Sequence, residues 1–148
     1  MWDYEHCVET SAAPEAVWRR WADVATWPEW NADIEEVRLD GPFAVGSVIT
    51  MTPKGQDPVV LRIVEAVPIG AGPVGAGRNA SFTDEADFGG TLIRTQHRVE
   101  RLENGRTRIV YRTEITGPEA DTLGPEISPA ITADFPETIA ALVHATLG

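Results

Sequence analysis

Two side chains suited to proton transfer, His97 and Tyr111, lie in segments that flank the Asn104-Gly105 pair. A neutral imidazole and a phenol can orient a carbonyl group or exchange a proton with it. The segments are residues 91–102 and 106–116, and both alternate apolar with polar side chains, which is typical of strands. We expect them to form a hairpin, and its register decides whether the two side chains meet.

The loop of this hairpin can have two lengths. A two-residue turn at Asn104-Gly105 would place polar side chains opposite apolar ones. A three-residue loop that includes Glu103, with Gly105 in the left-handed conformation, shifts the pairing by one residue. Because the buried pattern sets strand register, we predict the three-residue loop. It pairs Val99 with Ile109, His97 with Tyr111, Thr95 with Thr113 and Ile93 with Ile115 on one face, and Glu100 with Arg108, Gln96 with Arg112 and Arg94 with Glu114 on the other.

This register places His97 beside Tyr111 on the buried face of the sheet, and two interpretations of the pair stay open. In one, the Tyr111 hydroxyl satisfies a histidine inside an ordinary core. In the other, the two side chains are catalytic and line a ligand cavity. His6 is expected to reach the same interior from the first strand, whereas His144 is expected to be exposed near the end of a helix.

The rest of the sequence supplies the elements that would hold this pair. Residues 2–10 alternate as a strand, after which we expect Ser11 to cap a short helix with Pro14 in its first turn. A second short helix is predicted over residues 23–27 and stopped by Pro28. Further strands are predicted over residues 34–39, 47–52, 59–67 and 78–84.

The C-terminal segment, residues 119–147, has apolar side chains at every third or fourth position. This spacing predicts a long helix, opened by Pro125 and kinked at Pro136. The expected arrangement is a curved antiparallel sheet of about seven strands, with two short helices after the first strand and the long helix covering the apolar face. The chain is therefore predicted to be a single α+β domain over residues 1–148.

A cavity between the sheet and the long helix would be lined mainly by apolar side chains. Trp27 and Trp30 flank a turn, and we expect them either to pack as core residues or to stack on a ligand. The side chains expected to contact a ligand, besides His97 and Tyr111, are Tyr4, His6, Val8, Trp27, Trp30, Phe43, Met51, Ile93, Thr95, Thr113, Phe135 and Ile139.

The composition argues against several classes of partner. Twenty-three acidic and twelve basic side chains give a formal net charge of -11, which disfavours nucleic acid and anionic membrane surfaces. A single cysteine, Cys7, allows no intrachain disulfide. The first residues lack the basic and apolar regions of a signal peptide, and no apolar stretch approaches the ~20 residues of a membrane span. We therefore expect a cytoplasmic protein without membrane insertion.

Two motifs match functional patterns by letter but lack the required context. Residues 70–75 spell the dinucleotide fingerprint GxGxxG, yet no helix is predicted after them, so we expect a loop and no nucleotide. Asp84, Glu85 and Asp87 are expected to lie on a loop and to face water. No histidine or cysteine spacing indicates a metal site, and we expect no cofactor.

Several segments resemble the START-like (SRPBCC, helix-grip) superfamily. They are Ser-Ala-Ala-Pro-Glu-Ala-Val-Trp at residues 11–18 and Trp-Pro-Glu-Trp-Asn at residues 27–31. Residues 81–85, 97–100 and 105–108 look like the bacterial polyketide cyclase/dehydrase-like branch. The resemblance implies a helix-grip fold with an apolar cavity for lipids, hormones, polyketides or other hydrophobic metabolites.

Three functional hypotheses follow from the residues and the resemblance together. The first is binding of a small hydrophobic molecule between the sheet and the C-terminal helix. The second is a polyketide cyclase or dehydratase in which His97 moves a proton and Tyr111 stabilises an enolate oxygen. The third is a protein-interaction adaptor whose cavity is filled. The oligomeric state stays open, and a homodimer is compatible with the sequence.

Overall fold

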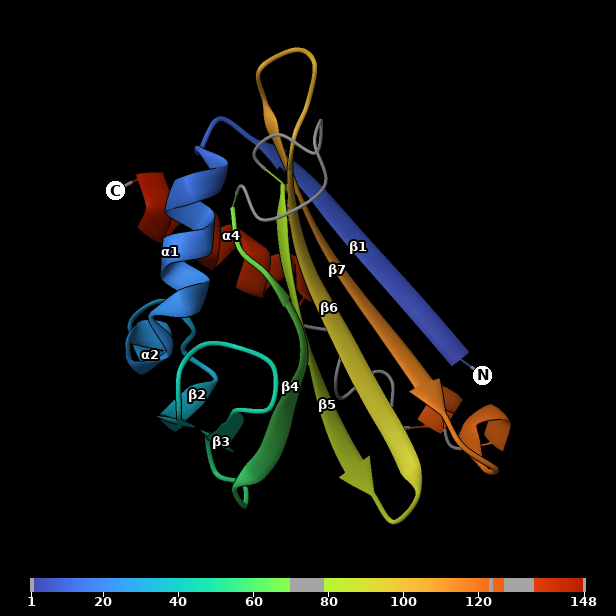
Figure 1. The fold of residues 1–148 in the computed structure, drawn as a ribbon. Coiled ribbons are helices and arrows are strands. Elements are labelled where there is room, and N and C mark those ends of the chain that lie inside the picture. The colour runs from blue at the N-terminus through green and yellow to red at the C-terminus, as the bar shows by residue number, and fades with distance from the viewer. Residues whose placement is uncertain (1, 70–78, 123, 127–134, 148) are drawn as a thin grey trace.

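The computed structural model describes residues 2–69, 79–122, 124–126 and 135–147, and its centre is one antiparallel sheet (Figure 1). The sheet has seven strands in the order β1-β7-β6-β5-β4-β3-β2. Their bounds are β1 (Trp2–Thr10), β2 (Ile34–Asp40), β3 (Val48–Pro53), β4 (Val59–Val67), β5 (Ala80–Phe88), β6 (Thr91–Arg101) and β7 (Thr107–Thr116).

The helices lie against one face of this sheet (Figure 1). They are α1 (Pro14–Ala22), the 3-10 helix η1 (Val24–Thr26), α2 (Trp27–Trp30) and α4 (Phe135–Leu147). Residues 120–122 and 124–126 are also helical. The predicted α+β class, with short helices after the first strand and a C-terminal helix packed on the sheet, is confirmed.

The hairpin of β6 and β7 has the predicted register. His97 lies opposite Tyr111, and every other predicted pair is present as well. The loop closes with a hydrogen bond of 2.8 Å from the Leu102 N–H to the Arg106 carbonyl, and Gly105 has φ of 83°. A side chain at that φ would be strained, so the glycine suits the last position of a three-residue loop.

The boundaries of the short helices differ from those predicted. Ala13, not Ser11, occupies the cap position of α1, and no side-chain hydrogen bond caps this helix. Pro28 does not stop a helix, because it lies in the first turn of α2, where no N–H is needed. Pro136 is the second residue of α4 as described, so the predicted kink depends on residues outside the described ranges, as do the GxGxxG segment and most of the loop around it.

The face of the sheet that meets the helices is apolar. Trp21 of α1 and Leu142 of α4 are almost fully buried in a main cluster with Phe82 and Ile109 of the sheet. A second, smaller cluster contains Ile93, Ile115 and Ala120, with Trp2 packed against it. Burial of these side chains is the main stabilising contribution to such a fold.

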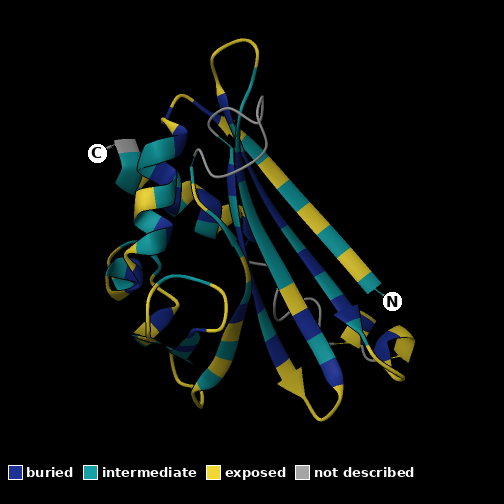
Figure 2. Ribbon diagram, in the orientation of Figure 1, coloured by how far each residue is buried: buried dark blue, intermediate teal, exposed yellow. Residues whose placement is uncertain are grey.

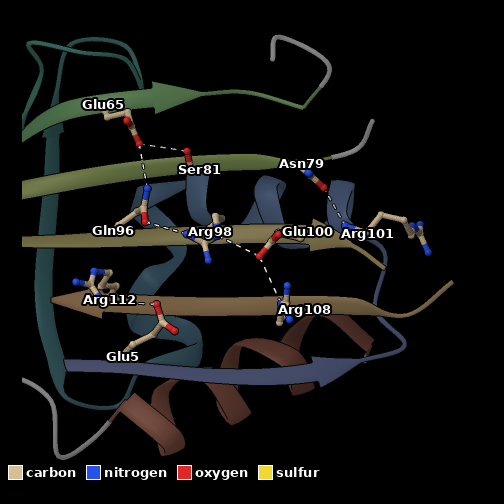
Figure 3. A network of polar contacts seen from close by, with 10 residues as sticks. All are labelled: Glu5, Glu65, Asn79, Ser81, Gln96, Arg98, Glu100, Arg101, Arg108 and Arg112. Atoms are coloured by element: carbon tan, nitrogen blue, oxygen red, sulfur yellow. Dashed lines mark hydrogen bonds and ion pairs between the residues drawn. The ribbon is translucent and has the colours of Figure 1, made fainter. Parts of the chain in front are cut away.

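The opposite face of the sheet carries charged side chains, with the helices behind them (Figure 3). The Arg98 and Arg108 guanidinium groups both approach Glu100, at 3.1 and 3.4 Å. Arg112 pairs with Asp3 at 2.6 Å and with Glu114 at 3.2 Å. Exposed pairs of this kind stabilise a protein by at most about 1 kcal/mol each, so they account for this face as a solvated surface. No helix in the described ranges is long and apolar enough to cross a membrane.

Candidate functional site

An aromatic row crosses the helix-facing side of the sheet from β1 to β5. It consists of His6, Tyr111, His97 and Phe82, which lie opposite one another on adjacent strands. Trp21 of α1 covers the row, with ring centroids 5.5 Å from Phe82, 6.0 Å from His97 and 6.2 Å from Tyr111. The predicted meeting of His97 and Tyr111 on the helix-facing side is confirmed.

Each polar side chain of this pair is hydrogen-bonded to another group of the core. Among the described residues, no hydrogen bond joins His97 to Tyr111. The Trp21 Nε1–H donates to the Tyr111 hydroxyl at 3.1 Å. His97 Nδ1 lies 3.3 Å from the carbonyl oxygen of Phe82, so this nitrogen donates, and the imidazole stacks on the Phe82 ring at 4.0 Å and 3°. The hydrogen bonds favour the interpretation of the pair as core residues.

Burial also keeps both groups electrically neutral. Desolvation lowers the pKa of His97 to about 3, and the hydrogen bond to Phe82 offsets only part of this shift. Desolvation raises the pKa of Tyr111, with a further rise from the charge of Asp84 and a partial offset from the Trp21 hydrogen bond. At neutral pH, His97 is therefore a poor proton acceptor, which argues against the proton-transfer role predicted for it.

A polar row lies next to the aromatic row, and each of its members is two residues away from a member of the aromatic row on the same strand. Tyr4, Thr113, Thr95 and Asp84 face one another across β1, β7, β6 and β5. The hydroxyl oxygens of Thr95 and Thr113 are 3.0 Å apart and hydrogen-bonded. Thr113, Thr95 and Asp84 of this row lie between the main apolar cluster and the smaller one that contains Ile93. The helix-facing side thus presents a polar band between two apolar surfaces.

Asp84 is the charged member of the polar row and is 7% exposed. Neither a hydrogen bond nor an ion pair to its carboxyl group is found among the described residues. Desolvation raises the pKa of this carboxyl to about 7, so it is partly protonated at neutral pH. A buried carboxyl with such a pKa, beside hydroxyl groups, can bind a cation, donate a hydrogen bond or transfer a proton.

The prediction that Asp84 lies on a loop and faces water is wrong. Strand β5 continues to Phe88, and Asp84 follows Ala80 and Phe82 at the two-residue spacing of the buried face. That spacing is visible in the sequence and was the available signal. The neighbouring Glu85 points to the other face, where it pairs with Arg94.

The other predicted ligand contacts divide into buried and partly exposed side chains. Trp27 is a core residue, since its ring packs near Phe82 and its Nε1–H donates to the Trp21 carbonyl at 3.1 Å. Thr113 and Ile93 are buried, as are Phe135 and Ile139 of α4. The partly exposed ones are Tyr4, His6, Val8, Trp30, Phe43, Met51 and Thr95. The alternation of partly exposed with exposed residues along β1 is visible in Figure 2.

The charged face also carries a cleft of about 280 Å³, lined by Val48, Val60, Arg62, Glu85 and Asp87. Its lining mixes charged groups with apolar ones, unlike the mainly apolar sites that bind small molecules. No group of three or more histidine, cysteine or carboxylate side chains suited to a metal occurs in the described part of the chain. The polar row and the apolar side chains around it form the candidate site.

The sequence matches the family model for polyketide cyclase/dehydrase and lipid transport over residues 1–145. No curated protein matches the chain significantly. Among solved structures, norcoclaurine synthase from Thalictrum flavum in complex with dopamine and hydroxybenzaldehyde has a TM-score of 0.70 at 16% identity, covering 99% of this chain and 86% of that one.

Two further solved structures are similar. A START superfamily protein from Mycobacterium smegmatis has a TM-score of 0.67 at 15% identity, covering 97% of this chain and 96% of that one. The di-domain aromatase/cyclase BexL of the BE-7585A biosynthetic pathway has a TM-score of 0.68 at 20% identity, covering 97% of this chain and 46% of that one. At these identities the likeness shows the fold, which is the helix-grip fold that the sequence resemblance implied.

Proposed function

Because the chain belongs to the polyketide cyclase/dehydrase and lipid transport family, we propose that it binds a small, largely apolar molecule between the sheet and its helices. One observation carries the proposal. Apolar side chains on the helix-facing side stay partly exposed, among them Val8 and Met51, although they pack against the main cluster. Accessible apolar surface on a side covered by helices is what a small-molecule site needs.

The polar row supports a ligand that is not purely apolar. Asp84 and Thr95 offer a carboxyl and a hydroxyl group between two apolar surfaces. A molecule with an apolar body and one polar group would match this arrangement. Norcoclaurine synthase, which has the same fold, was solved in complex with dopamine and hydroxybenzaldehyde, two small aromatic molecules that carry polar groups.

A substitution that fills the site tests this proposal. Thr95→Phe adds volume on the helix-facing side of the sheet. Gln96→Phe is the control, because it places the same side chain at the next position of β6, which faces the opposite side. We expect native mass spectrometry of the purified protein to detect a bound apolar metabolite, retained about tenfold less in Thr95→Phe, because the added ring occupies its space. Gln96→Phe should retain it as the original protein does.

Equal retention in the two variants would contradict an interior site. A protein that carries no metabolite and binds neither aromatic nor acyl compounds would contradict ligand binding altogether. Circular dichroism spectra of both variants provide the control for folding.

A second candidate function is catalysis of the cyclase or dehydratase type. The observation that favours it is the Asp84 carboxyl, whose pKa of about 7 suits general acid–base catalysis at neutral pH better than that of His97. In this case Asp84→Asn should lower turnover of a polyketone substrate by about a hundredfold or more and leave its binding intact. A His97→Gln variant should keep most of the activity, and the opposite ranking would exclude Asp84 as the proton-transfer group.

A further inference from the structure

Asp84 lacks an opposite charge within the described residues. On the strands beside it, Arg62 lines the cleft on the charged face and Arg94 pairs with Glu85 there. Arg98 pairs with Glu100 on the same face (Figure 3). Arg101 lies at the far end of β6, where its guanidinium group donates to the Gly105 carbonyl at 2.7 Å. The helix-facing side around Asp84 therefore carries a carboxyl group and no cation from β4 or β6.

Several polar groups in the two rows around Asp84 already have hydrogen-bond partners. Thr95 is hydrogen-bonded to Thr113. The Tyr111 hydroxyl accepts from Trp21, and His97 uses Nδ1 on a backbone carbonyl. Tyr111 is the titratable group whose electrostatic interaction with Asp84 is resolved, and it is neutral at physiological pH. Nothing among these groups compensates an ionised Asp84.

An unpaired carboxylate that is more than nine-tenths buried is costly, because it loses hydration without gaining a hydrogen bond or a counter-charge. Two events remove this cost: protonation of the carboxyl, or the arrival of a cation with its own N–H donors. A protonated amine supplies both the charge and the donors, and charge-assisted hydrogen bonds in a desolvated site are strong. A carboxylate ligand would instead add a second negative charge.

We propose that Asp84 anchors the protonated amine of the ligand, while the apolar body of that ligand lies on the apolar side chains flanking the polar row. This inference rests on the proposed binding function and names its ligand class. Among molecules of the same shape, the site then binds the amine most tightly, the neutral alcohol less tightly and the carboxylate most weakly. Fatty acids and other anionic lipids are disfavoured.

Calorimetric titration with phenylbutylamine, phenylbutanol and phenylbutyrate tests the inference, because the three share an apolar body. At about pH 8, we expect the amine to bind at least about tenfold more tightly than the alcohol, and the carboxylate to bind most weakly. Asp84→Asn should abolish the preference for the amine over the alcohol without weakening the alcohol. Asp87→Asn is the matched control on the same strand: it is exposed, and its amide keeps the oxygen that accepts from the Gly90 N–H.

Proton release gives an independent readout. At about pH 7, amine binding should expel part of a proton from Asp84, which appears as a dependence of the heat on the ionisation enthalpy of the buffer. Asp84→Asn should remove this dependence, and Asp87→Asn should not.

The outcomes separate the two levels of the proposal. Equal affinity of the original protein for amine and alcohol, or an amine preference that persists in Asp84→Asn, would overturn the anchoring role and leave the binding function standing. Binding of none of the three compounds would contradict the binding function for this class of ligand, and the anchoring role with it.

Discussion

We expect the effect of Asp84→Asn on the free energy of unfolding to depend on pH. The effect should be more stabilising at about pH 8 than near pH 3, by about 4 kcal/mol. The pKa of this carboxyl rises from 3.8 in the exposed state to about 7 in the folded protein because burial penalises the charge. A raised pKa means that the stability contribution is complete below pH 3.8 and is lost as the pH rises through about 7. Asparagine cannot ionise and does not have this loss.

His97 has the opposite pH dependence. Burial lowers its pKa from 6.5 to about 3, so its contribution to stability is complete above pH 6.5 and is lost as the pH falls toward 3. Between about pH 4 and 6.5 the two groups oppose each other, and the free energy of unfolding of the original protein should change less than that of either variant. Asp84→Asn should reveal the loss of stability that His97 causes as the pH falls. His97→Gln should reveal the loss of stability that Asp84 causes as the pH rises toward neutral.

Urea unfolding followed by tryptophan fluorescence over this pH range measures both effects. A buried asparagine amide has its own desolvation cost, but that cost does not vary with pH, so the difference between the two curves is the relevant quantity. The control is Asp87→Asn, an exposed position on the same strand. If the free energy of unfolding varies with pH in the same way in the original protein and in Asp84→Asn, then burial does not raise the pKa of Asp84.

Phe82→Ala is expected to lower the free energy of unfolding by about 3–5 kcal/mol. Phe82 is 1% exposed and has four aromatic neighbours: its ring centroid is 4.0 Å from that of His97, 5.0 Å from Phe43, 5.5 Å from Trp21 and 6.2 Å from Trp27. These rings come from β6, α1, α2 and the segment before β3. Truncation leaves a cavity at the point where the short helices meet the sheet.

Phe88→Ala is the matched control, because Phe88 lies on the same strand and is 54% exposed. We expect its effect on the free energy of unfolding to stay within about 0.5 kcal/mol. Comparable losses in the two variants would contradict the placement of Phe82 at the centre of the core.

The sequence by itself determined the sheet and the register of its last hairpin. Strand periodicity is local, and the three-residue loop follows from the need to put apolar opposite apolar side chains, so the residue pattern was sufficient to place His97 opposite Tyr111. The same local rule failed at Asp84, where the acidic composition of residues 84–87 outweighed the alternation that continues through β5. It failed also at Pro28, since a proline fits the first turn of a helix as well as its end.

The tertiary structure decided what the polar side chains can do. Trp21 lies 90 positions from Tyr111 in the sequence, and only the packing of α1 on the sheet brings its indole N–H to the phenol. The neutral state of His97 and the raised pKa of Asp84 both result from desolvation, which depends on every element that covers a group. Periodicity tells which face of a strand a residue occupies, but the partners and dielectric surroundings of that residue exist only once the helices are in place.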